Sequence, residues 1–100
     1  MLKTNDISKL PLSGVRIIEW AIKAAGPAAT KFLADMGAEV IKVEIPAGGD
    51  PNRDSGSMFN LPHGVPYNFE NFNRNKKSIA VDLTKEEGKQ IIYSLVATVD

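Results

Sequence analysis

The most constraining feature of the sequence is a pair of short segments rich in Val and Ile, separated by a helical pattern. Residues 15–20 and 39–44 are typical of buried strands, because β-branched residues suit strands that are packed on both faces. Gly26 and Pro27 open the helix expected between them, and Gly37 supplies the left-handed residue that ends it. Strand, helix and strand within about 30 residues form a βαβ unit, which predicts two parallel strands.

The second half of the chain continues this alternation. Residues 78–83 predict a third strand, and residues 67–75 before it are expected to be a short helix or an irregular segment. Thr84 and Glu87 have the spacing of a capping box, which predicts that a second long helix begins there. Apolar residues at helical spacing are expected to face the sheet; they are Ala28, Ala29, Phe32, Leu33 and Met36 in the first helix and Ile91, Ile92, Leu95, Val96 and Val99 in the second.

The chain divides into a polar leader, residues 1–13, and one α/β segment, residues 14–100. Residues 46–66 hold four of the six prolines and four of the eight glycines, and so long an irregular stretch is usually functional or mobile. Three strands and two helices cannot cover both faces of a parallel sheet. We therefore expect the opening piece of a longer protein, with coverage by a partner as the alternative.

Composition excludes several classes of function. The 12 basic and 12 acidic side chains balance, so the basic excess of nucleic-acid-binding proteins is missing. The absence of cysteine removes thiolate catalysis, Cys-based zinc sites and disulfides, and a single histidine, His63, is too little for a His-based metal site. The sequence shows no signal peptide and no apolar run near the length of a membrane span. We expect a cytoplasmic protein without a metal, nucleic acid or membrane as partner.

A ligand site is expected at the carboxyl ends of the strands, where open parallel sheets bind their ligands. Residues 21–27, 45–49 and 81–85 follow the three predicted strands. The first and third of these loops open helices, whose free N–H groups and partial positive charge favour phosphate; the alternative is that they are only the solvated ends of a sheet. Basic side chains that could supply charge around such a site are Lys23, Arg53, Arg74, Lys76, Lys77 and Lys85.

A dinucleotide site is the main rival interpretation. Glu44 lies 18 residues after Gly26, about where a Rossmann acidic residue binds a ribose hydroxyl. The turn holds one glycine where the fingerprint has three, so we favour a carboxylate of Glu44 that is solvated or paired with a lysine. Asp50, Asp54 and Asp82 have no visible partner for acid–base chemistry, and Asp82 is expected to anchor a turn.

Several separate blocks of sequence closely resemble the amino terminus of class III CoA-transferases, the family that includes formyl-CoA and carnitine CoA-transferases and α-methylacyl-CoA racemase. The blocks are residues 11–19, 25–30, 33–44, 48–50, 53, 73–83 and 87–88. The resemblance implies a large subunit whose amino-terminal, Rossmann-like part binds CoA, and a dimer of interlocked subunits. It also implies transfer of CoA from an acyl-CoA to a carboxylic acid through an aspartyl anhydride and an enzyme thioester, with CoA as substrate and no permanently bound cofactor.

The resemblance also implies which residues would contact CoA. Three departures from the family pattern stand among them: Ala24 replaces a glutamine, Ile45 an arginine and Thr84 a lysine, with Lys85 one position later. The resemblance places the catalytic aspartate beyond residue 100, so we expect this chain alone to be inactive. A racemase-like enzyme and a non-catalytic CoA-binding or dimerising module remain alternatives, as do a homodimer and a heteromer. The implied CoA contacts are Lys23, Ala24, Ala25, Ile45, Val81, Asp82, Leu83, Thr84 and Lys85.

Overall fold

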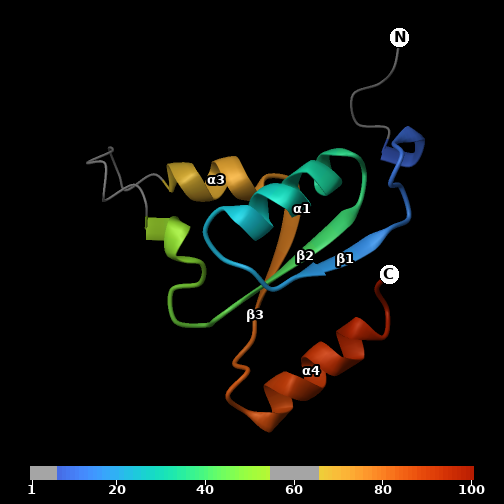
Figure 1. The fold of residues 1–100 in the computed structure, drawn as a ribbon. Helices are drawn as coiled ribbons and strands as arrows, with labels where there is room; N and C mark the ends of the chain where they lie inside the picture. The colour runs from blue at the N-terminus through green and yellow to red at the C-terminus, as the bar shows by residue number, and fades with distance from the viewer. Residues whose placement is uncertain (1–6, 55–65) are drawn as a thin grey trace.

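The structure, a computed structural model, describes residues 7–54 and 66–100 and contains one parallel sheet (Figure 1). Its strands lie in the order β1-β2-β3, and both neighbouring pairs are parallel. The predicted α/β class and the βαβ unit are therefore confirmed. His63 lies outside the described residues. The elements are η1 (Ile7–Lys9), β1 (Arg16–Glu19), α1 (Ala25–Asp35), β2 (Glu39–Glu44), η2 (Pro51–Asp54), α3 (Tyr67–Asn73), β3 (Lys76–Ala80) and α4 (Glu86–Val96).

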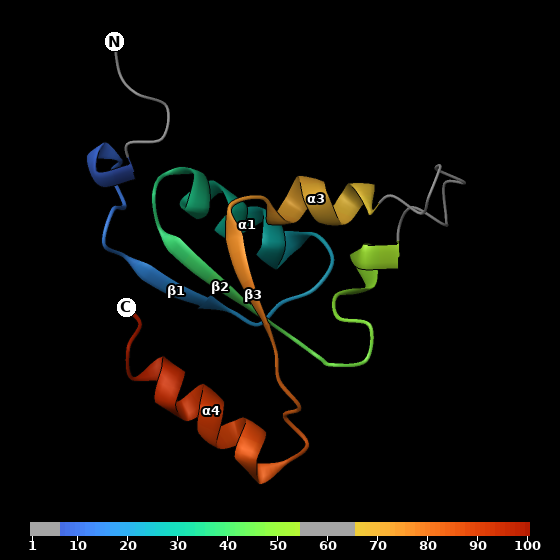
Figure 2. The ribbon, with the colours of Figure 1, turned by 180° about the vertical axis from the view of Figure 1, so that it is seen from behind.

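Helices α1 and α3 lie together above the strands in Figures 1 and 2, and α4 lies below the strands, away from both helices. Val40 of the central strand packs against Ala34 of α1. Because side chains alternate along a strand, Lys42 and Glu44 project from the same face as Val40. The face below α1 is thus apolar near the amino end of β2 and charged near its carboxyl end.

The apolar core is small and lies under the carboxyl-terminal half of α1. Ala34, Ala38 and Val40 are buried there, with Leu33 and Ile17 among the half-buried residues packed on them. Small residues at the contact let the helix approach the sheet closely, as ridge-and-groove packing requires. Gly37 ends the helix with a φ of +106°, as predicted.

The predicted buried face of α1 is wrong in part. Phe32 is 58% exposed and Met36 is 40% exposed, whereas Pro27 and Lys31 are buried with Ala34. The Lys31 ammonium lies 4.7 Å from the centroid of the Phe32 ring. The helix is therefore rotated so that Pro27, Lys31 and Ala34 are buried in place of Phe32 and Met36.

The second half of the chain differs from prediction at two boundaries. The third strand spans Lys76–Ala80 rather than 78–83, although the N–H of Val81 still donates to the Glu44 carbonyl at 2.9 Å. The capping box does not form: Lys85 is the N-cap of α4 without a side-chain cap bond, and the Thr84 hydroxyl donates to Asp82 instead. Residues 67–73 form the short helix that was one of the two expectations for that segment.

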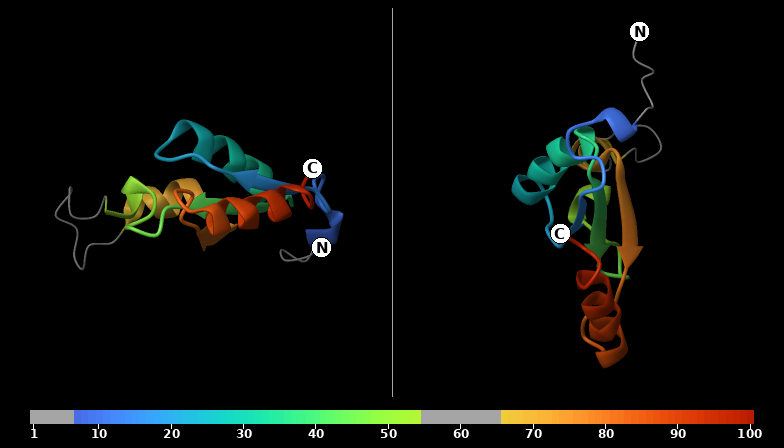
Figure 3. Two further views of the ribbon diagram at one scale, coloured as in Figure 1. Left: turned by 90° about the horizontal axis from the view of Figure 1, so that it is seen from below. Right: turned by 90° about the vertical axis from the view of Figure 1, so that its right-hand side faces the viewer.

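Helix α4 does not bury the apolar stripe predicted for it. Ile91 is 54% exposed and Val96 is 51% exposed. After the helix, the N–H of Asp100 donates to the Arg16 carbonyl at 3.0 Å, and the N–H of Arg16 donates to Asp100 Oδ2 at 2.9 Å. Figure 3 shows the chain end beside β1. Among the described helices, none has the length and apolar character that crossing a membrane requires.

Gly88 provides a test of how α4 begins. A Cβ at this position would lie 1.9 Å from the carbonyl oxygen of Asp82 and 3.3 Å from Cγ1 of Val81. Replacing glycine by alanine inside a helix normally stabilises a protein by up to about 1 kcal/mol, but this contact reverses the sign. We expect Gly88→Ala in the full-length protein to lower the thermal unfolding midpoint, and exposed Lys89→Ala to leave it unchanged. Unchanged unfolding of Gly88→Ala would contradict the packing of α4 against the Asp82 turn.

Candidate functional site

The carboxyl ends of the three strands bring predicted site residues from two loops together. Ile45, after β2, and the segment 81–84, after β3, line one cavity of about 380 Å³. A second cavity of about 330 Å³ adjoins it, and Ile45 and Trp20 line both. Lys23, Ala24, Ala25 and Lys85 line neither cavity. All four are exposed: Lys23 and Ala24 precede α1, Ala25 is its first residue, and Lys85 is the N-cap of α4.

Trp20 is a site residue that sequence reasoning did not single out. It directly follows β1, is 73% exposed, and meets Ile45, itself 57% exposed, at the rim between the two cavities. Leu83 adds a third apolar side chain to the first cavity. The position of Trp20 immediately after a buried strand was the available clue, because residues there lie at the edge where parallel sheets bind ligands. The rim offers an apolar surface suited to a flat ring.

Asp82 anchors the turn between β3 and α4, as predicted. Its Oδ1 accepts hydrogen bonds from the backbone N–H of Thr84 at 3.0 Å and from the Thr84 hydroxyl at 2.6 Å. These bonds, the hydroxyl bond foremost, lower the pKa of Asp82. The carboxylate therefore shapes the loop that lines the first cavity.

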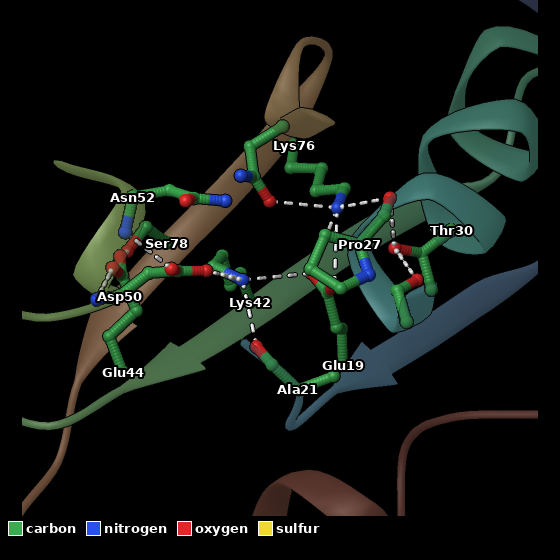
Figure 4. Close-up of polar contacts among 12 residues, drawn as sticks. Glu19, Ala21, Pro27, Thr30, Lys42, Glu44, Asp50, Asn52, Lys76 and Ser78 are labelled. Atoms are coloured by element: carbon green, nitrogen blue, oxygen red, sulfur yellow. Dashed lines mark hydrogen bonds and ion pairs between the residues drawn. The ribbon is translucent and has the colours of Figure 1, made fainter. Parts of the chain in front are cut away.

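A buried ionic cluster lies below these loops, between the sheet and α1, and consists of Glu19, Lys42, Asp50 and Lys76 (Figure 4). Lys42 Nζ lies 2.9 Å from Asp50 Oδ2 and 3.6 Å from Glu19 Oε2, and Lys76 Nζ lies 3.0 Å from Glu19 Oε2. Each of the four side chains is at most 2% exposed. Two ammonium groups thus face two carboxylates, and the cluster is neutral as a whole.

The cluster corrects several expectations about charge. Lys76 is not a cation available at the ligand-binding edge: burial lowers its pKa, and its bonds to Glu19 oppose that shift. Asp50, expected without a partner, is paired with Lys42. Arg74 and Lys77 are also engaged away from the predicted site, because they pair with Asp35 at 2.8 Å and Glu39 at 2.5 Å.

Glu44 is neither solvated nor paired with a lysine, contrary to prediction. Its side chain is 5% exposed, and both carboxylate oxygens accept hydrogen bonds of 2.7 Å from the Arg53 guanidinium. Ser78 and the backbone N–H of Asp50 also donate to it. The Arg53 bonds foremost, with help from Ser78 and Asp50, hold the pKa of Glu44 at about 2.

Gly49 permits this arrangement. It has a φ of +69°, and a Cβ there would lie 2.6 Å from Glu44 Oε1. The Arg53 guanidinium also stacks 3.8 Å from the centroid of the Phe69 ring, which ties η2 to α3. Arg53 is therefore held within the fold by Glu44 and Phe69.

The lowered pKa of Glu44 predicts a loss of stability in acid. Because the folded pKa of about 2 lies below the usual value of 4.5, the ionised carboxylate stabilises the fold above pH 4.5. That contribution, on the order of 3 kcal/mol at most, disappears as the pH falls from 4.5 towards 2. We expect Glu44→Gln to be less stable than wild type near pH 7 and to approach it at low pH in thermal melts. Glu87→Gln, at an exposed position of α4, is the control, and a stability difference independent of pH would contradict the pairing.

Comparison with known proteins identifies the family to which this chain belongs. The chain is a Rossmann-like α/β unit, and the family model for CoA-transferase family III matches residues 12–100. The chain belongs to CoA-transferase family III. This confirms the resemblance found in its sequence.

Its similarity extends to curated relatives and solved structures. The chain is 46% identical over 99 residues to the succinate–glutarate CoA-transferase of Agrobacterium fabrum, covering 92% of this chain and 24% of that protein. It is 41% identical over 92 residues to the succinyl-CoA–L-malate CoA-transferase alpha subunit of Chloroflexus aurantiacus, covering 92% and 21% respectively. The crystal structure of Rv3272 from M. tuberculosis superposes with a TM-score of 0.80 at 43% identity, covering 91% and 24%. The chain therefore spans about a quarter of the length of these relatives.

Proposed function

We propose that this chain provides part of the CoA-binding site of an enzyme that transfers CoA from an acyl-CoA to a carboxylic acid. The observation that carries the proposal is the convergence of Ile45 with the segment 81–84 on one cavity at the carboxyl edge of the sheet. These positions were assigned to CoA from the family resemblance, and the rule for ligand sites in parallel sheets selects the same edge. Membership of CoA-transferase family III supports the chemistry.

The adenine and the phosphates of CoA would meet different parts of this edge. The adenine ring is flat and apolar, and the exposed Trp20 and Ile45 with Leu83 offer it a matching surface. The phosphates require cations or free N–H groups, which the exposed Lys23 and Lys85 and the first turn of α1 can supply. The thioester end would then extend towards the nucleophile, which the resemblance places beyond residue 100.

The transfer requires that CoA stays bound between its two chemical stages. A carboxylate of the enzyme attacks the thioester carbonyl, which releases the CoA thiolate and leaves a mixed anhydride. The thiolate then attacks the enzyme's acyl carbon, which releases the first acid and forms an enzyme thioester; attack by the second acid reverses these steps. Holding the departed thiolate close to the anhydride makes its return effectively intramolecular. Retention of CoA by its nucleotide end is the task we assign to this chain.

Assembly and location complete the proposal. We propose an interlocked homodimer or a heteromer of related subunits, in the cytoplasm. The relative from Chloroflexus aurantiacus, named as an alpha subunit, supports the second form. The acid substrate is set by parts of the protein outside this chain, and succinyl-CoA is the first probe because it occurs in the name of that relative.

The transferase proposal predicts a trappable acyl-enzyme. We expect full-length protein incubated with succinyl-CoA and hydroxylamine to gain a hydroxamate on one aspartate, which peptide mass spectrometry would locate. Protein incubated with hydroxylamine alone is the control. Binding of CoA without any such adduct would contradict transfer chemistry and favour a racemase-like enzyme or a non-catalytic CoA-binding module.

Lys85 tests where the phosphates lie. If its ammonium contacts the 3′-phosphate, Lys85→Ala should weaken binding of CoA about tenfold and binding of dephospho-CoA hardly at all, because a hydrogen bond to a charged group contributes about 1.5–3 kcal/mol. Titration calorimetry with both ligands measures this difference. Lys77→Ala is the control, because Lys77 is an exposed lysine that pairs with Glu39 away from this edge. Equal weakening of both ligands would contradict a contact to the 3′-phosphate.

A further inference from the structure

We infer that Asp50 and Asn52 are positioning residues for the 21–25 loop, and that the backbone geometry they impose sets the affinity of the protein for CoA. Neither residue is among the CoA contacts implied by the family resemblance. The inference rests on the proposed function, because it concerns the loop that carries three of the implied CoA contacts, Lys23, Ala24 and Ala25.

The two side chains bond both backbone groups of a single loop residue. The N–H of Lys23 donates to Asp50 Oδ1 at 3.3 Å, and the Lys23 carbonyl accepts from Asn52 Nδ2 at 2.8 Å. Lys23 has a φ of +66°, a left-handed conformation that is unfavourable for a residue with a Cβ. These two hydrogen bonds, which we call the bracket, therefore hold Lys23 in a conformation that it would otherwise seldom adopt.

Asp50 can hold the loop because it is itself fixed on several sides. Its Oδ2 lies 2.9 Å from the buried ammonium of Lys42, its Oδ1 accepts from the N–H of Asn52 at 2.9 Å, and its own N–H donates to Glu44 at 2.9 Å. Lys42 Nζ also donates to the carbonyl of Ala21 at 2.9 Å. The ionic cluster thus reaches the loop at two points, directly through Lys42 and indirectly through Asp50 (Figure 4).

At the other end of the loop, α1 is held by the same cluster. Lys76 Nζ donates to the carbonyl of Pro27 at 2.9 Å, in the first turn of the helix. The backbone from Ala21 to Pro27 is therefore fixed from below, while the side chains of Lys23, Ala24 and Ala25 are exposed. Such a loop is rigid on its protein side and open on its solvent side, which is what a preorganised binding loop requires.

The location of the bracket argues for a role in binding rather than in core packing. The Asn52–Lys23 bond is at the surface, away from the apolar core of Ala34, Ala38 and Val40. Left-handed residues that are held by their surroundings cluster at ligand sites, where the conformation serves the ligand. Removal of the Asn52 amide should consequently alter the loop much more than the stability of the fold.

Asn52→Ala in the full-length protein is the decisive variant. We expect the Kd for CoA, measured by titration calorimetry, to rise about fivefold, because one neutral hydrogen bond is lost and Lys23 gains freedom in the unbound state. The KM for the acyl-CoA should rise in parallel, while kcat at saturation changes less than about twofold because the nucleophile is elsewhere. Hydrogen exchange of the 21–28 backbone without ligand should quicken. Asn52→Asp, which turns a repelling oxygen towards the Lys23 carbonyl, should weaken CoA further.

Gln90→Ala is the matched control, because it removes an exposed amide hydrogen bond, 3.0 Å to Glu86, from α4. It should leave the Kd for CoA unchanged. An unchanged Kd in Asn52→Ala, or equal weakening by Gln90→Ala, would overturn the inference while the proposed function stands. Failure of the wild-type protein to bind CoA would overturn the CoA-binding proposal and this inference together.

Discussion

The structure depends on the pairing of two buried ammonium groups with two buried carboxylates between the sheet and α1. Removing an ion from water costs several kcal/mol even in a relaxed protein, so Lys42 and Lys76 can be buried only because Glu19 and Asp50 lie beside them. Backbone carbonyls and Asn73 Oδ1 accept further hydrogen bonds from the two ammonium groups. Loss of any one partner would leave an uncompensated charge in a site with almost no contact with solvent.

This pairing explains why the two ends of the sheet are built differently. Near the amino ends of β1 and β2, Ile17 and Val40 pack against α1, and the contact is apolar. Lys76 also starts from the amino end of its strand, but its ammonium reaches Glu19 and the carbonyl of Pro27. Near the carboxyl ends, the chain turns and leaves the carbonyls of Ala21 and Pro27 to be bonded by side chains, which apolar residues cannot do. Lysine can do so, because its ammonium carries three donors on a flexible stem. Lysine hydrogen bonds therefore hold the loops at the carboxyl ends of the strands, whereas apolar packing holds α1 near the amino ends of β1 and β2.

Much of the fold could be predicted from local sequence pattern, but the buried ionic cluster below the candidate site could not. The bounds of β2, its parallel pairing with β1 and the helix stop at Gly37 agree with prediction, because β-branched runs and a left-handed glycine act within a few residues. The burial of Lys76 was not predictable in this way. It depends on Glu19, 57 positions away, and on the register that places Lys76 beside Val40. Local sequence pattern predicts that Lys76 is exposed to solvent. Its burial becomes clear only when the register of the three strands is known.

The same reasoning accounts for the polarity of the candidate ligand edge. The family resemblance implies an arginine at the position of Ile45, and Arg53 cannot replace that cation because Glu44 and Phe69 hold it. Trp20, Ile45 and Leu83 instead make the rim of the cavity apolar. Binding of a nucleotide here would accordingly draw on ring packing at the adenine and on Lys23, Lys85 and the start of α1 for the phosphates. Since Asp50 and Asn52 hydrogen-bond the backbone of Lys23, and Asp50 is paired with Lys42, the charge of Lys23 at the candidate ligand edge is positioned in part by the ionic cluster buried beneath it.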